Sequence, residues 1–151
     1  MTMTVSRREA LALSAGAVAV LAFGSARPAF AKNDSDDLIK AFTGGKTPTK
    51  GKVRLDLPDI AENGNTVPLA FSVESPMTDA SHVTDVLIVA DGNPRAGVAT
   101  FHFSPRSGVA EAATRIRLAE TQNVIAVAKM NDGSLFMDTR QVKVTIGGCG
   151  G

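Results

Sequence analysis

The single cysteine of this chain, Cys149, is the side chain best suited to covalent chemistry. It stands between two glycine pairs, Gly147-Gly148 and Gly150-Gly151, at the end of the sequence. A cysteine thiolate is a strong nucleophile that can hold a group covalently. A catalytic cysteine needs a base and an orienting group within hydrogen-bond reach, and the neighbouring glycines supply neither. Because glycine has broad backbone freedom and no side chain, residues 147–151 are predicted to form a thin, flexible arm that presents a carrier thiol.

Two other interpretations of Cys149 stay open from the residues alone. An unpaired cysteine in an exported protein can form an intermolecular disulfide, and a terminal cysteine can also have no function. A copper site is disfavoured because only glycines follow Cys149, so no ligand lies downstream of it. We therefore expect no metal site.

The two histidines, His82 and His102, are weak candidates for catalysis. In the run Phe101-His102-Phe103, strand alternation places His102 on the face opposite the two phenylalanines, which predicts a surface position. His82 opens a predicted strand. Two histidines and one cysteine are also too few for an ordinary closed zinc site.

The N-terminus has the pattern of an export signal. Arg7 and Arg8 precede an apolar stretch over residues 10–26, and Ala29-Phe30-Ala31 resembles a cleavage site. The arginine pair indicates the twin-arginine route, so residues 1–31 are predicted to be a cleaved signal and the protein to be periplasmic. A membrane anchor is the alternative, but the stretch is short and rich in Ala and Gly. We expect no membrane association after cleavage.

The composition is typical of one globular domain, which we expect to span residues 32–146. The chain has 151 residues, is 44% hydrophobic and 21% charged, and carries a net charge of +1. That charge disfavours a nucleic-acid partner. The absence of Trp and Tyr disfavours base-stacking surfaces as well.

Apolar and polar residues alternate with a period of two over much of the chain, which predicts an all-β fold. A short helix is expected at residues 38–42, preceded by Asp and Ser residues and ended by Gly44-Gly45. About seven strands are expected, at residues 53–57, 67–73, 83–90, 98–103, 112–118, 124–130 and 135–144. Turn signals separate them and no βαβ rhythm occurs, which favours a two-sheet β-sandwich.

One strand is predicted to be buried on both faces. Residues 86–90 read Val-Leu-Ile-Val-Ala, which is apolar at both alternating sets of positions. Either the outer face meets a partner protein, or the N-terminal helix covers it.

The sequence resembles the SoxY family, the sulfur-carrier subunits of the periplasmic Sox thiosulfate-oxidation system. The resemblance spans nearly all of residues 32–151. It is carried by Gly147-Gly148-Cys149-Gly150-Gly151 and by further segments at residues 57–64, 67–68, 93–94, 114–119 and 126–133.

The resemblance implies an immunoglobulin-like sandwich and a carrier that is not itself an enzyme. Cys149 would hold an S-thiosulfonate and then persulfide species, with no other cofactor. SoxZ would be the stable partner, and SoxAX, SoxB and SoxCD would load, hydrolyse and oxidise the bound sulfur. A structural or adhesive sandwich cross-linked through Cys149 is the alternative, and a cysteine hydrolase or transferase is the least favoured.

Overall fold

The structure is a computed structural model that describes residues 34–148, which belong to a single compact unit. The expected export signal with Arg7 and Arg8 lies outside the described residues. The same holds for Cys149, Gly150 and Gly151.

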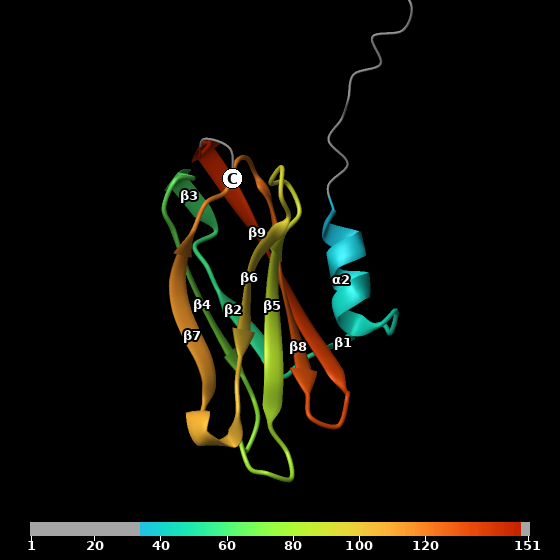
Figure 1. The fold of residues 1–151 in the computed structure, drawn as a ribbon. Helices are drawn as coiled ribbons and strands as arrows, with labels where there is room; N and C mark the ends of the chain where they lie inside the picture. Colours follow the sequence, from blue (N-terminus) through green and yellow to red (C-terminus); the bar gives the residue numbers. More distant parts are fainter. Residues whose placement is uncertain (1–33, 149–151) are drawn as a thin grey trace, which may run out of the picture. The chain divides into compact units, whose positions relative to one another are not determined.

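Two β-sheets pack face to face, as predicted from the sequence (Figure 1). One sheet has the order β1-β9-β8-β5-β6, with β3 also paired to β9, and the other has the order β2-β4-β7. The elements are α2 (Ser35–Thr43), β1 (Thr49–Lys50), β2 (Val53–Asp56), β3 (Ile60–Asn63), β4 (Val67–Val73), β5 (Val83–Ala90), β6 (Gly97–His102), the 3-10 turn η1 (Pro105–Ser107), β7 (Ala110–Ile116), β8 (Gln122–Met130) and β9 (Leu135–Ile146). The expected all-β sandwich with a short N-terminal helix is confirmed.

The described chain contains nine strands rather than the expected seven. The two additional strands, β1 and β3, both pair in parallel with β9. β1 has two residues, both exposed, and β3 buries only Ala61. Such short and largely exposed segments show no alternation of apolar and polar residues, so no local pattern predicts them.

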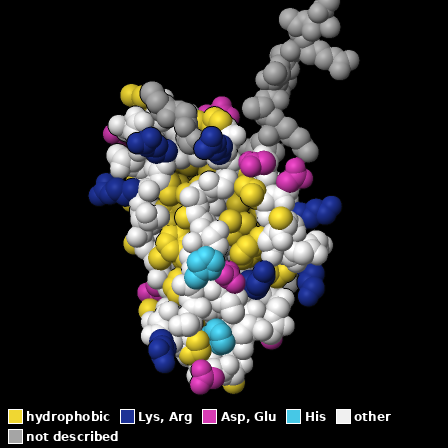
Figure 2. All heavy atoms as spheres, in the orientation of Figure 1, with side chains coloured by type: hydrophobic (Ala, Val, Ile, Leu, Met, Phe, Trp, Pro, Cys, Tyr) yellow, Lys and Arg dark blue, Asp and Glu magenta, His cyan; other side chains and the backbone are white. Residues whose placement is uncertain are grey.

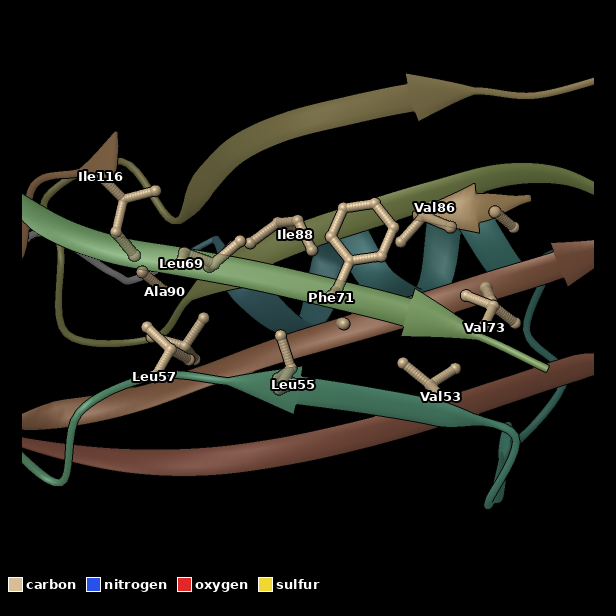
Figure 3. Packing of buried hydrophobic residues seen from close by; sticks show 14 of the residues in the cluster. Val53, Leu55, Leu57, Leu69, Phe71, Val73, Val86, Ile88, Ala90 and Ile116 are labelled. Atoms are coloured by element: carbon tan, nitrogen blue, oxygen red, sulfur yellow. The ribbon is translucent and has the colours of Figure 1, made fainter. Parts of the chain in front are cut away.

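The core lies between the sheets and is built by alternating apolar side chains. In β4, the buried residues Leu69, Phe71 and Val73 alternate with more exposed ones. Figure 3 shows these side chains beside those of the neighbouring strand β2, with side chains of β5 from the other sheet facing them across the interior. The Phe71 ring meets that of Phe101 edge to face, with centroids 5.0 Å apart, and so joins the two sheets.

The helix α2 covers the outer face of β5. Val86 and Ile88 point into the main core, whereas Leu87 and Val89 pack with Leu38, Ile39 and Phe42 in a second apolar cluster. Figure 1 shows α2 running beside the sheet that contains β5. The apolar run 86–90 is therefore explained within the chain, and of the two alternatives the covering helix is the one observed.

Both sheets end in an edge strand, paired on one side only, on the same side of the sandwich. β6 is the last strand of one sheet and β7 the last of the other, and η1 connects them. Figure 2 shows hydrophobic atoms reaching the surface on this face. Val98, Phe101 and Ala112 are among the partly buried residues packed on the core.

Candidate functional site

The end of β9 delivers the chain to the C-terminal glycines. The strand ends at Ile146, and Gly147 and Gly148 follow as described residues. Gly148 is buried, and its N–H donates a hydrogen bond of 2.9 Å to the Leu118 carbonyl oxygen. The structure thus places these two glycines with the sandwich, whereas the sequence predicted that a flexible arm starts at Gly147.

Hydrogen bonds between three distant segments hold this end of the molecule together. The Gly64 N–H donates to the Ile146 carbonyl oxygen at 2.8 Å, and the Leu118 N–H donates to the Gly64 carbonyl oxygen at 2.8 Å. The Leu118 carbonyl oxygen then accepts from Gly148. We call Gly64, Leu118 and Ala119 the C-terminal seat.

Glycine is required in the seat because of space. A Cβ on Gly147 would overlap the Ala119 carbonyl oxygen, and one on Gly148 would lie 2.8 Å from the Gly64 carbonyl oxygen. A Cβ on Gly64 would overlap the Leu118 carbonyl oxygen. None of these glycines has a left-handed backbone, so the missing side chain permits the close approach of one backbone to another.

Two buried amide side chains, those of Asn93 and Gln122, support the loop that contains the seat residues Leu118 and Ala119. Asn93 and Gln122 are each only 4% exposed. The Asn93 Nδ2 donates to the Arg117 carbonyl oxygen at 2.9 Å, and its Oδ1 accepts from the Ala119 N–H and from Gln122 Nε2, both at 2.9 Å. The Gln122 Oε1 accepts from the Gly92 N–H at 2.8 Å. A satisfied buried network of this kind fixes the loop that contains Leu118 and Ala119.

Sequence reasoning missed the role of this pair. The sequence indicates Asn93 as part of a turn and of the segment 93–94 that carries the family resemblance, and it does not single out Gln122. The signal that could have found Gln122 is its position at the start of a mostly apolar strand, where a polar residue that is buried needs hydrogen-bond partners.

Exposed charges of both signs surround the seat. Arg95 and Arg117 are exposed, and so are Glu62 and Glu120. Figure 2 likewise shows dark blue and magenta side chains at the upper end of the molecule. This rim therefore has no single-sign field.

The histidines lie at the other end of the sandwich. His82 precedes β5, and His102 pairs with Asp85 near the start of that strand, whereas Gln122 and Gly92 meet beyond its end. Eight residues of strand separate the two ends by about 26 Å. The His102 side chain is 76% exposed, and its Nδ1 lies 2.6 Å from Asp85 Oδ1, which confirms the expected surface position. In residues 34–148 no three His, Cys, Asp or Glu side chains converge as a metal site would require.

Comparison with known proteins identifies the family. The family described as sulfur oxidation protein SoxY matches residues 39–149 of the chain. This chain belongs to the SoxY family. The matched range ends at Cys149, which follows Gly148 in the sequence.

Solved structures agree with this assignment. The sulfur carrier protein SoxY from Chlorobium limicola f thiosulfatophilum is 34% identical, with a TM-score of 0.60, over 74% of this chain and 96% of that one. A superoxide reductase (neelaredoxin) from Ignicoccus hospitalis has a TM-score of 0.56 at 15% identity, over 62% of this chain and 80% of that one. The latter similarity shows the fold alone. No curated protein matches the chain significantly.

Membership of the SoxY family gives the chain a sulfur-carrier role in the Sox system. Within the described residues, no helix is long and apolar enough to span a membrane.

Proposed function

We propose that this SoxY-family chain holds sulfur intermediates covalently on Cys149 and presents them to other enzymes of the Sox system. Family membership with a match that extends to Cys149, the only cysteine in the sequence, is the observation that carries the proposal. Because there is one thiol, no second cysteine of the same chain competes for the cargo or resolves it as a disulfide.

The chemistry needs a thiolate and partners that exchange electrons and water. In loading, the Cys149 Sγ bonds to the outer sulfur of thiosulfate, and two electrons pass to the haem centres of SoxAX. Hydrolysis by SoxB then adds water to the terminal sulfonate, so that sulfate leaves and a persulfide stays on the protein. SoxCD would oxidise that persulfide further.

The described residues support a carrier rather than an enzyme. The seat is built from backbone groups. The side chains that support it are amides, which form hydrogen bonds but do not ionise at neutral pH and so cannot act as a general acid or base. Measured along β5 from its end at Ala90, His82 lies about 26 Å away, and Asp85, the partner of His102, lies about 17 Å away. A carrier that leaves the chemistry to other proteins must bind them. We therefore infer a stable partner, SoxZ, and transient contacts with SoxAX, SoxB and SoxCD.

Mass spectrometry of the protein from cells grown on thiosulfate tests the proposal. We expect mass increments of thiosulfate or of added sulfur on the C-terminal peptide, and none in a Cys149→Ser control. A protein that carries only an intermolecular disulfide at Cys149 would instead support the structural alternative and contradict the carrier role.

Export is a separate proposal that rests on the N-terminal sequence. We infer that Arg7 and Arg8 direct twin-arginine export to the periplasm and that cleavage follows Ala31. Fractionation should find the wild-type protein in the periplasm, beginning at Lys32, and the Arg7→Lys, Arg8→Lys double variant unprocessed in the cytoplasm. A processed periplasmic double variant would refute this route.

A further inference from the structure

We propose that the C-terminal seat fixes the origin of the carrier arm, and that Asn93 and Gln122 are positioning residues for the thiol. In this arrangement Gly147 and Gly148 belong to the body, and the arm begins after Gly148. The inference rests on the proposed function of Cys149, but the seat itself can be tested independently.

Close backbone packing is concentrated at this one place. Among glycines in residues 34–148, those where an added Cβ would come within 3.0 Å of another atom are Gly64, Gly92, Gly147 and Gly148. Three of them form the contact between the seat and the C-terminal glycines. The fourth, Gly92, packs on Gln122, whose Cβ would lie 2.8 Å from the added carbon. A tail that only needed mobility would not require close packing on the body.

The supporting amides connect to Gly148 through two steps. Asn93 holds both sides of Leu118, because it donates to the Arg117 carbonyl oxygen and accepts from the Ala119 N–H. The Leu118 carbonyl oxygen thereby has a fixed position, and it accepts the Gly148 N–H. Gln122 fixes Asn93 in turn through the bond between Nε2 and Oδ1. A change at Asn93 should therefore reach Gly148 through the Leu118 carbonyl group.

If the seat fixes Gly148, the covalent geometry of the chain limits how far the Cys149 sulfur can lie from the body. With Gly148 seated, the Cys149 Sγ lies at most about 7 Å from the Gly148 Cα, because consecutive Cα atoms are 3.8 Å apart. If the chain were released after Ile146, the same sulfur would reach about 13 Å from the Ile146 Cα. The accessible volume grows with the cube of this radius, about sixfold. The effective concentration of thiol at a docked enzyme falls correspondingly.

The test compares Gly148→Ala with Gly150→Ala, the same change at the glycine that contacts the seat and at one two residues later in the sequence. Amide hydrogen exchange of the purified protein should show the wild-type Gly148 N–H protected at least about tenfold, because it is bonded and buried. Gly148→Ala should lose that protection, and Gly150→Ala should keep it. An unprotected Gly148 N–H in the wild type would overturn the seat.

Loading kinetics with thiosulfate and SoxAX test the positioning role. Gly148→Ala should raise the KM for the carrier several-fold, up to about sixfold, with kcat and the rate of alkylation by iodoacetamide unchanged. Asn93→Ala should raise the KM in the same direction and reduce Gly148 protection. An unchanged KM in both variants would overturn the positioning role while leaving the carrier function intact.

The two proposals fail in different ways. If wild-type protein is not loaded at all, the proposed function is wrong, and hydrogen exchange still decides whether the seat exists. If loading occurs but Gly148→Ala and Gly150→Ala raise the KM equally, the glycines serve access to the enzyme and the seat has no positioning role.

Discussion

Replacing Asn93 with alanine should destabilise the fold by about 3 kcal/mol. The change removes the partner of the Arg117 carbonyl oxygen, the Ala119 N–H and one Gln122 Nε2 hydrogen. Each buried polar group left without a partner costs about 1 kcal/mol at the lower end of the usual range. We use the lower end because Arg117 is exposed and Ala119 is half-buried, so water can reach them.

Urea denaturation of the purified variant measures this loss. With an unchanged m-value, the midpoint should fall, because the loss is a large share of the roughly 5–15 kcal/mol that stabilises a domain. Asn131→Ala is the matched control. Its side chain makes two hydrogen bonds, with the His82 N–H and the Ala80 carbonyl oxygen, against three for Asn93, but it is exposed.

Burial is what separates the two variants. The control should lose less than about 1 kcal/mol, because water replaces both of its bonds. Equal losses in the two variants would refute the reasoning, since burial of the Asn93 network would then add nothing to stability.

Three other predictions concern the tail, the core and a turn. Cys149→Ser should leave the urea midpoint within about 0.5 kcal/mol of wild type while abolishing sulfur loading; a clear loss of stability would mean that the thiol packs on the body. Phe71→Ala should cost about 3–5 kcal/mol by the same assay, because Phe71 is 3% exposed and contacts two rings, and a loss below about 1 kcal/mol would contradict the packing. The Ser134 hydroxyl and N–H donate to Asp132 and hold the pKa of that carboxyl below its usual value. Ser134→Ala should therefore raise this pKa in an NMR titration of the carboxyl carbon. The stabilisation from the Asp132 bonds is present at neutral pH and is lost as pH falls through the lowered folded-state pKa, so an unchanged pKa in Ser134→Ala would refute the assignment.

The strands that the sequence predicted well are those with a strong local pattern. β4 and β5 have the expected bounds, because alternation or a continuous apolar run is closed by turn residues on each side. β1 and β3 exist only because β9 offers them an edge, and that edge is formed by residues more than eighty positions away. No local pattern carries such information.

The glycine motif shows a different limit. Glycine serves either backbone freedom or close approach, and the residue type alone does not distinguish them. At Gly147 and Gly148 the choice is made by the seat, which lies in other loops of the chain. The amide pair was missed for a similar reason, because the partners of Asn93 and Gln122 are separated in sequence by more than twenty residues.

The pairing of β9 has a mechanical consequence. The strand that leads to Cys149 is flanked by β8 along one edge and by β1 and β3 along the other. A force applied to the C-terminus by a bound enzyme would act along the axis of β9. The hydrogen bonds between β9 and its neighbouring strands lie across that axis. They are therefore loaded together in shear rather than opened one at a time. The chain can be handled repeatedly by its end while the sandwich stays folded.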